Sequence, residues 1–215
     1  MAMPEITYFD VRGRAEPIRL ILEGRGVDYE DIQVESEEWK TLKPKTPFGG
    51  LPTYREGDLA LVQSHAIYRH LARRHEIYGA DEAQRVRCDM AVEALRDAKD
   101  HLGYAAWRPD FQEQRASFEK NELPEKLGAL ERFFGADLNG PGHWAGVPTF
   151  ADAVGFAYLD DVDALFPGAL VANPSLEKFR EEFATRRPIA DYLRSTRRPE
   201  AIQYGPHGKI YPAPR

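Results

Sequence analysis

The sequence has very little cysteine, no long apolar run and no excess of basic residues. Cys88 is the one cysteine among 215 residues, so an intramolecular disulfide is excluded. Apolar stretches extend over only a few residues, whereas a membrane-spanning helix needs about 20. The formal net charge is −6 and no basic stripe stands out, which disfavours nucleic-acid binding. These absences predict a protein of the reducing cytoplasm.

The amino terminus also lacks the features of a secretory signal. Residues 1–5 contain neither a basic region nor an apolar one. Hydrophobic residues make up 42% of the chain, which is enough for a packed core. The length fits one large domain or two small ones. Cys88 has no CxxC partner and lies among helical residues, so we interpret it as structural.

Strand and helix signals alternate in residues 1–79. Strands are expected at 5–9, 29–34, 51–54 and 59–62, and helices at 16–24, at 36–42 and from Ser64. Residues 43–50 are rich in proline and glycine and are expected to form a loop. The order strand–helix–strand, loop, strand–strand–helix predicts an α/β unit.

From residue 83 on, the chain shows helical periodicity and little strand signal. Four apolar stripes recur at helical spacing and are expected to be core. They consist of Val86, Met90, Leu95, Ala98 and Leu102; Leu123, Leu127, Leu130 and Phe134; Val154, Tyr158, Val162 and Leu165; and Leu176, Phe179 and Phe183. The expected domains are therefore 1–79 and 80–215. Residues 202–215 are rich in proline, glycine and tyrosine and are expected to form an extended tail over the surface.

The stretch from Tyr8 to Arg19 combines the end of a strand, a tight turn and the start of a helix. Gly13 gives the turn its conformational freedom, and Pro17 suits a first helical turn. The Tyr8 phenol thus lies beside a helix N-terminus with Arg14 close by, an arrangement suited to holding an anion. Arg12 is expected to pair with a carboxylate behind the loop.

Residues 149–152 (TFAD) fit a capping box before an apolar helix. From this motif alone, Asp152→Ala is expected to cost roughly 1–2 kcal/mol. The pair Gln63-Ser64 is either a plain helix cap, with Ser64 as N-cap, or a second anion site.

Two other clusters are interpreted as lacking a metal. Asp160, Asp161 and Asp163 have no histidine or cysteine nearby in the sequence, so a solvated helix face is expected. The histidines at 65, 70 and 75 are five residues apart, a spacing that turns them away from one another on a helix.

Taken in order, these motifs closely resemble those of a cytosolic glutathione transferase of the tyrosine type, nearest the sigma and pi classes. The resemblance covers roughly residues 6–198 and rests on residues 8–16, Trp39, Lys43, residues 47–49, Leu51-Pro52, Gln63-Ser64 and residues 149–152. It implies a thioredoxin-like N-terminal domain, an all-helical C-terminal domain and a homodimer with active sites at the interface. It also implies glutathione as co-substrate and no metal.

The resemblance assigns site residues one by one. Tyr8 is implied as the catalytic phenol with Arg14 beside it. The implied glutathione-binding residues are Tyr8, Arg14, Trp39, Lys43, Gly50, Leu51, Pro52 in a cis peptide, Gln63, Ser64 and, from the partner subunit, Asp97. The implied electrophile site contains Phe9, Val11, Trp107, Tyr158 and Tyr204, and the implied dimer interface Phe48, Arg69, Arg73 and Asp89. Gly50 departs from the family, because many relatives carry a glutamine or lysine there, so a weaker grip on glutathione is expected.

The chemistry of a thiol explains the need for the phenol. A thiol has a pKa of about 8.5 and is mostly protonated at neutral pH. A hydrogen bond from Tyr8 to the thiolate, contributing about 1.5–3 kcal/mol, is expected to lower the pKa of that thiol by about 1–2. The leading hypothesis is conjugation of glutathione to apolar electrophiles. The alternatives are a glutathione-dependent isomerase of the prostaglandin type and a non-catalytic binding or structural relative. The tail, 202–215, is expected to lid the electrophile pocket.

Overall fold

The computed structural model describes residues 2–136 and 142–213. The chain begins with β1 (Glu5–Phe9), α1 (Glu16–Gly24), β2 (Glu30–Val34), α2 (Ser36–Leu42), the short 3-10 helix η1 (Lys43–Lys45), β3 (Thr53–Glu56), β4 (Leu59–Val62) and α3 (Ser64–Arg74). The strands form one mixed sheet in the order β2-β1-β3-β4, in which β1 is parallel to β2 and antiparallel to β3. The α/β architecture predicted for this part is confirmed, with η1 added inside the predicted loop.

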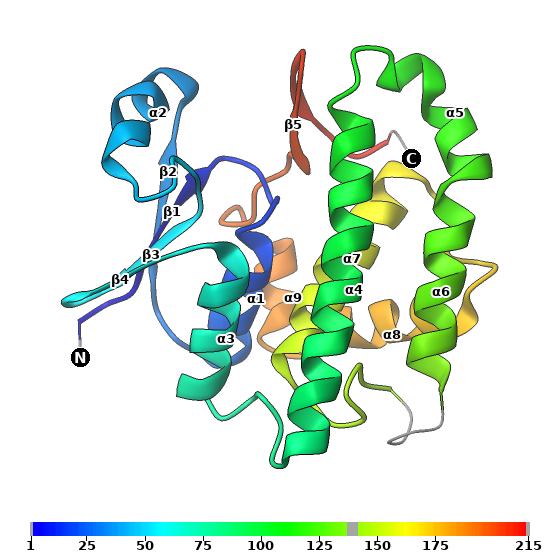
Figure 1. Ribbon diagram of the computed structural model, residues 1–215, viewed down its shortest axis with the longest axis horizontal. Helices are drawn as coiled ribbons and strands as arrows, with labels where there is room; N and C mark the ends of the chain where they lie inside the picture. Colours follow the sequence, from blue (N-terminus) through cyan, green and yellow to red (C-terminus); the bar gives the residue numbers. More distant parts are fainter. Residues whose placement is uncertain (1, 137–141, 214–215) are drawn as a thin grey trace.

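The second part is helical, as predicted. It contains α4 (Glu82–Ala106), α5 (Phe111–Asn121), α6 (Leu123–Gly135), α7 (Phe150–Leu165), α8 (Pro174–Thr185) and α9 (Ile189–Arg194), followed by the hairpin of β5 (Gln203–Gly205) and β6 (Gly208–Ile210). In Figure 1, α1 and α3 lie between the sheet and the helices α4 and α7. Within the described ranges, no helix is both long and apolar enough to cross a membrane.

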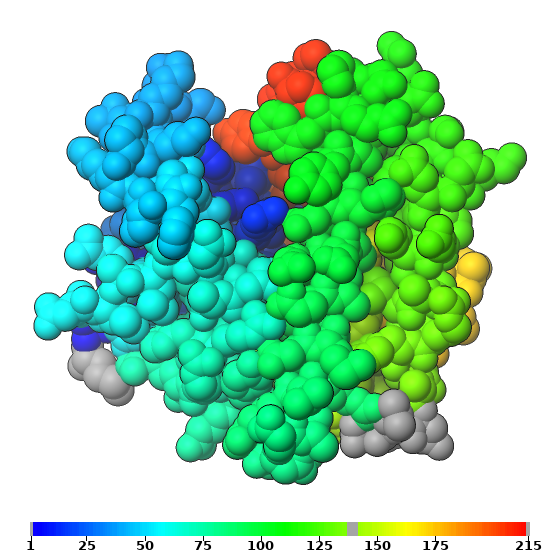
Figure 2. All heavy atoms as spheres, viewed as in Figure 1, coloured from blue at the N-terminus to red at the C-terminus, as the bar shows by residue number. Residues whose placement is uncertain are grey.

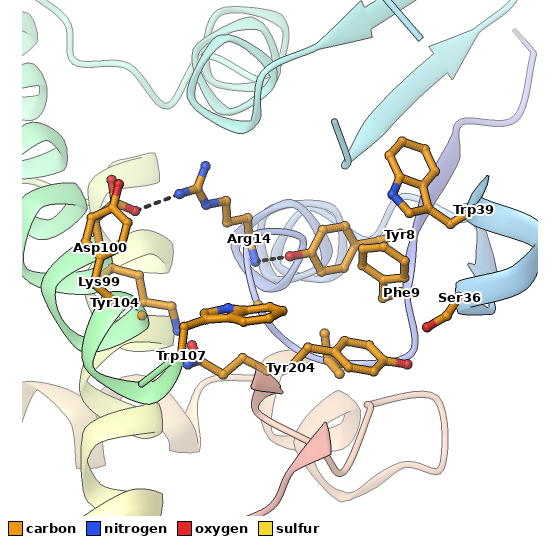
Figure 3. A pocket seen from close by; sticks show the side chains of 14 residues that line it. Tyr8, Phe9, Arg14, Ser36, Trp39, Lys99, Asp100, Tyr104, Trp107 and Tyr204 are labelled. Atoms are coloured by element: carbon orange, nitrogen blue, oxygen red, sulfur yellow. Dashed lines mark hydrogen bonds and ion pairs between the residues drawn. The ribbon is translucent and has the colours of Figure 1, made fainter. Parts of the chain in front are cut away.

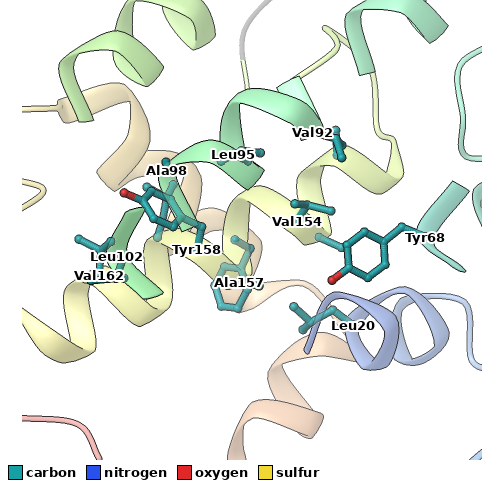
Figure 4. Packing of buried hydrophobic residues seen from close by; sticks show 14 of the residues in the cluster. Leu20, Tyr68, Val92, Leu95, Ala98, Leu102, Val154, Ala157, Tyr158 and Val162 are labelled. Atoms are coloured by element: carbon teal, nitrogen blue, oxygen red, sulfur yellow. The ribbon is translucent and has the colours of Figure 1, made fainter. Parts of the chain in front are cut away.

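The core of the helical part is centred on α7. This helix is buried along nearly its whole length because α1, α4 and α8 pack around it. Figure 4 shows Leu95, Ala98 and Leu102 of α4 beside Tyr158 and Val162 of α7. The core prediction fails for Val86 and Met90, which are 48% and 56% exposed. Both lie at the start of α4, on a face that no described element covers.

The predicted capping box forms at the start of α7, where the Thr149 N–H donates to the Asp152 carboxylate at 3.4 Å. Helix α3 differs from the prediction by one residue. Its N-cap position is occupied by Gln63, and Ser64 is the first helical residue. Gln63 has a φ of 68°, an uncommon conformation for a residue other than glycine.

The acidic cluster on α7 is not the solvated face that the sequence suggested. Asp161 is fully buried, and the side chain of Asp160 is 16% exposed. The Arg12 guanidinium lies 3.5 Å from Asp160 and 3.8 Å from Asp161, and Arg198 lies 2.6 Å from Asp160. The expectation that Arg12 pairs with a carboxylate is therefore confirmed. The acidic residues hold the turn after β1 against α7, which the local sequence pattern could not reveal.

The C-terminal tail is more structured and more buried than the extended surface segment that the sequence predicted. Ala201, Ile202 and Gln203 are at most 8% exposed. The N–H groups of Arg12 and Gly13 donate to the carbonyls of Ala201 and Ile202, both at 2.9 Å. The hairpin that follows is tied to the turn after β1 by Lys209, whose ammonium lies 2.6 Å from Asp10. The tail is thus built into the loop that carries Tyr8.

Candidate active site

Tyr8 lies at the point where β1 ends and the chain turns into α1. Its side chain is largely buried, and its hydroxyl oxygen accepts a hydrogen bond from the Arg14 backbone N–H at 3.1 Å. Gly13, with a φ of 46°, packs its backbone directly against the ring. A Cβ at this position would lie 2.6 Å from the Tyr8 hydroxyl oxygen. The turn therefore both positions the phenol and requires a glycine beside it.

A cavity of about 450 Å³ opens in front of Tyr8. Figure 2 shows the hollow between the N-terminal part and α4. In Figure 3, Tyr8, Arg14 and Trp39 lie on one side of the cavity, and Trp107 and Tyr204 on the opposite side. The wall comprises Tyr8, Phe9, Val11, Gly13, Arg14, Ser36, Trp39, Lys99, Asp100, Gly103, Tyr104, Trp107, Gln203 and Tyr204. The cavity wall thus combines six aromatic side chains with charged and polar ones from Arg14, Ser36, Lys99, Asp100 and Gln203.

Aromatic contacts join the segments that form the wall. The Phe9 ring lies edge-on to Trp39 at 5.9 Å and to Tyr204 at 5.4 Å between ring centroids. Phe9 therefore links α2 on one side with the C-terminal hairpin on the other. Edge-to-face pairs of this kind are favourable beyond their buried area and hold the rings in defined orientations.

The cationic residues in the wall are already paired with carboxylates. The Arg14 guanidinium contacts Asp100 at 2.8 Å, which joins the turn to α4. Lys99 contacts the buried Asp161 behind the wall. Burial raises the pKa of Asp161, although Lys99 and Arg12 oppose the rise. The charges of Arg14 and Lys99 are therefore largely balanced by carboxylates of the protein before any ligand binds.

The structure brings together only part of the predicted set. Tyr8, Phe9, Val11, Arg14, Trp39, Trp107 and Tyr204 share the cavity. Tyr158 does not line it, being 2% exposed and facing a smaller cavity of about 30 Å³ between α3, α4 and α7. Helical periodicity identifies the apolar face of α7, but it could not predict which of the two cavities Tyr158 faces.

The other predicted glutathione residues lie outside the cavity wall. Lys43, Gly50 and Gln63 are exposed, Leu51 is half-buried, and Pro52 and Ser64 are buried. The Leu51–Pro52 peptide bond is cis, as the resemblance implied. Gln63 precedes α3, whose first backbone N–H groups have no acceptor within the helix. The strained backbone at Gln63 is of the kind that clusters at ligand sites.

The residues predicted for a dimer interface are on the surface or pair within the chain. Phe48 is 71% exposed. Asp97, which was predicted to bind glutathione from the partner subunit, lies on α4 with its side chain 71% exposed. Arg69 contacts Asp89 at 2.8 Å and Glu93 at 2.7 Å. Arg73 lies 6.0 Å from the centre of the Tyr78 ring. Arg69 and Asp89 thus satisfy one another without a partner subunit.

Seven residues of the wall were not among the site residues expected from the sequence: Gly13, Ser36, Lys99, Asp100, Gly103, Tyr104 and Gln203. Helical spacing would have found some of them, because Lys99 and Gly103 precede Trp107 by eight and four residues and so share its face. Gln203 belongs to the tail that was expected to lid the electrophile pocket, but within that tail no local pattern distinguished it from its neighbours.

Two other groups are poor candidates for chemistry. Burial lowers the pKa of His65 to about 4, so its imidazole is neutral at physiological pH. Burial raises the pKa of Cys88 to about 11, which keeps its thiol protonated and unreactive. Across residues 2–136 and 142–213, no group of three or more histidine, cysteine, aspartate or glutamate side chains is arranged to hold a metal ion.

Comparison with known proteins gives a consistent result. The family model for the glutathione S-transferase N-terminal domain matches residues 4–73, and that for the C-terminal domain matches residues 96–196. The chain is 41% identical to "Glutathione S-transferase P" of Caenorhabditis elegans, over 88% of this chain and 91% of the relative. It is 34% identical to a glutathione S-transferase of Dirofilaria immitis, over 87% and 90% of the two chains.

Solved structures are similar as well. The pi-class glutathione S-transferase of Onchocerca volvulus aligns with a TM-score of 0.83 and 31% identity, over 88% of this chain and 91% of the other. The rat hPGDS complexed with a quinoline aligns with a TM-score of 0.82 and 27% identity, over 93% and 99% of the two chains.

Proposed function

The chain belongs to the glutathione S-transferase family, and from this membership we propose that it activates the thiol of glutathione through the Tyr8 hydroxyl and adds the thiolate to electrophilic, largely apolar substrates. Glutathione is the co-substrate used by the family. The tyrosine mechanism and the class of electrophile are the proposed steps. The curated relatives reported above are named glutathione S-transferases, which supports the transferase over the isomerase and non-catalytic alternatives.

One observation carries the mechanism: the Tyr8 hydroxyl lies in the wall of the cavity and accepts a hydrogen bond from the Arg14 N–H at 3.1 Å. Because its oxygen already accepts, the hydroxyl proton is available for a group in the cavity. An accepted hydrogen bond also polarises the O–H and makes it a stronger donor. A thiolate is the acceptor that benefits most, since hydrogen bonds to charged groups contribute about 1.5–3 kcal/mol.

Activation of this kind uses the ligand's own sulfur as the nucleophile, so the protein needs no catalytic cysteine. Cys88, with a pKa raised to about 11 by burial, is unsuited to that role. The aromatic wall then holds an apolar electrophile against the thiolate, and this proximity contributes to the rate. In this proposal, glutathione contacts Trp39, Lys43, Leu51, Gln63 and Ser64, with Pro52 holding Leu51 in place.

The mechanism is tested by Tyr8→Phe, which removes the hydroxyl and keeps the ring. We expect conjugation to fall at least tenfold, because one hydrogen bond to a charged sulfur is lost. Glutathione binding, measured by calorimetry, should persist. The pKa of bound glutathione, followed by thiolate absorbance, should rise toward that of the free thiol. Wild-type turnover by the variant would overturn the mechanism.

A homodimer, in which Asp97 of the partner subunit reaches the γ-glutamyl amine, is part of the proposal. Phe48 supports it, because a phenylalanine that is 71% exposed on a loop is suited to inserting into a second subunit. Phe48→Ser is expected to shift the protein toward monomer in sedimentation velocity and to weaken glutathione binding. Val171→Ser is the matched control, since Val171 is 67% exposed on the helical part. If both variants dimerise as strongly as the wild type, the proposed role of Phe48 is contradicted.

A further inference from the structure

A cavity of about 170 Å³ that the proposed mechanism does not use is lined by residues of α1, the start of α7, the end of α8 and the start of α9. Helix α9 packs beside α1 and α8 (Figure 1). Among the described residues, this α1–α9 cavity shares no lining residue with the cavity in front of Tyr8, and it contains none of the residues predicted for the dimer interface. It is therefore a separate site on the chain.

The inner surface of the α1–α9 cavity is apolar. It is formed by Leu20 and Ile21 of α1, Phe150 of α7 and Ile189 of α9, each at most 3% exposed, with the Phe183 ring of α8 beside them. An apolar cavity of roughly 150 Å³ accepts a benzene ring, whereas sites for drug-sized ligands measure roughly 300–1,000 Å³. The α1–α9 cavity thus suits an apolar group of about the size of a phenyl ring.

Three arginines contribute to the same lining, and two of them lack a partner. The Arg186 guanidinium is engaged, because it lies 3.8 Å from Asp152 and 5.0 Å from the centre of the Phe183 ring. Arg25 and Arg187 are exposed, and neither forms an ion pair with any residue in the described ranges. An apolar cavity bordered by two unpaired cations favours a ligand that joins an apolar group to a negative charge.

The one carboxylate in the described lining, that of Asp152, is already compensated within the protein. It is 2% exposed, accepts a hydrogen bond from the Trp144 N–H at 3.1 Å and lies 2.6 Å from the His143 ring. The charges left for a ligand are those of Arg25 and Arg187. The planar donors of a guanidinium match the two oxygens of a carboxylate, so a carboxylate is the anion that we assign to this site.

We propose that the α1–α9 cavity binds a small free monocarboxylic acid, with an apolar group about the size of a phenyl ring in the cavity and the carboxylate held by Arg25 and Arg187. The acid contacts three helices that are brought together only by folding, so its binding stabilises the folded chain. The proposal goes beyond the proposed function and does not depend on it, because binding can be measured without glutathione.

The test is a ligand-observed NMR titration of the protein with phenylacetate. We expect saturable binding with a dissociation constant of roughly 0.2–5 mM, typical of a ligand of this size. Phenylacetamide, the neutral analogue, should bind at least tenfold more weakly, because a hydrogen bond between charged groups is lost. The double variant Arg25→Met/Arg187→Met should weaken phenylacetate binding to the same extent. Arg194→Met is the matched control, since Arg194 lies on α9 outside this lining and pairs with Asp191; it should bind as the wild type does.

A second variant, Gly24→Leu, fills the cavity without removing a charge. Gly24 is helical, and an added Cβ would lie 3.6 Å from Ile189 Cδ1, an ordinary contact. Leucine also favours a helix over glycine, so this variant should fold, which its melting temperature checks, and should bind no phenylacetate. The proposal is overturned by the absence of saturable binding, by equal affinity for the amide, or by binding that persists in Gly24→Leu or in the double variant. Persistent binding would place the acid elsewhere, such as in the cavity in front of Tyr8.

Discussion

At the scale of single residues, the geometry around Tyr8 depends on the absence of a Cβ atom at Gly13. Gly13 has a φ of 46°, and its lack of a side chain lets the backbone pack against the phenol. An added Cβ would lie 2.6 Å from the hydroxyl oxygen and 2.8 Å from a ring carbon, Cε1. These distances are below any normal contact, so the ring would have to move. The position of the hydroxyl is therefore determined by Gly13 as much as by Tyr8.

Gly13→Ala is expected to lower conjugation at least tenfold by displacing the Tyr8 hydroxyl from its place in the cavity wall. It should also destabilise the fold by about 1 kcal/mol, because alanine is strained at positive φ. Steady-state kinetics and urea unfolding measure the two effects. Gly26→Ala separates them, since Gly26 has a φ of 64° and nothing within 4 Å of an added Cβ. This control should lose stability but keep its activity; a fully active Gly13→Ala would contradict the argument.

At the scale of elements, the start of α7 is more than a helix cap. The Asp152 carboxylate accepts from the Trp144 N–H at 3.1 Å and lies 2.6 Å from the His143 ring, in addition to its contact with Thr149. It is 2% exposed. Asp152 therefore anchors the loop that precedes the central helix of the core as well as the first turn of that helix.

Asp152→Ala is accordingly expected to destabilise the protein by about 2–4 kcal/mol, more than the cap alone, because several hydrogen bonds to a buried charge are lost. Chemical denaturation measures this. Asp81→Ala is the matched comparison: Asp81 caps α4 through one bond from the Gln84 N–H at 2.8 Å and is exposed. Its loss should be about 1 kcal/mol. Similar losses for the two variants would show that the loop contacts of Asp152 contribute nothing.

At the scale of the whole molecule, buried ion pairs join the α/β part to the helical part. The Arg198 guanidinium contacts Glu16 of α1 at 2.7 Å and Asp160 of α7 at 2.6 Å. Burial acts to raise the pKa of Glu16, but Arg198 and Arg19 outweigh it and leave the pKa below its ordinary value of 4.5. The Glu16 carboxylate thus stabilises the folded state at neutral pH, and this contribution is lost as the pH falls through its lowered pKa.

Arg198→Met is expected to reduce stability by about 3–5 kcal/mol at pH 7, because it removes one guanidinium partner from each of two largely buried carboxylates, Glu16 and Asp160. The deficit should shrink in acid and be smallest below the lowered pKa of Glu16, where that carboxylate is protonated with or without Arg198. Arg194→Met is the control, since Arg194 pairs with Asp191 on an exposed surface and should contribute less than about 1 kcal/mol. Urea unfolding at several pH values checks both; equal deficits for the two variants would refute the prediction.

Local patterns were enough to predict the secondary structure closely. The strand at 5–9, the helix at 16–24 and the helix at 36–42 have the bounds expected, because alternation, proline and acidic first turns act within a few residues. Prediction failed where the partner of a residue is far along the chain. Val86 and Met90 follow the same spacing as core residues of α4 and yet are exposed, since periodicity identifies a face but not what covers it.

The candidate site, like the fold, was predicted only in part from the sequence. The order of motifs in the sequence determined the fold, the family and the position of Tyr8 at a strand end beside a glycine turn. Only the tertiary structure decided which side chains share a cavity with Tyr8. Tyr158 faces the smaller cavity instead, whereas Gln203, which follows Tyr8 by 195 residues, lies in the wall of the cavity in front of Tyr8. The physical reason is that turns and helices follow from neighbours in sequence, whereas a cavity wall follows from how separate elements pack.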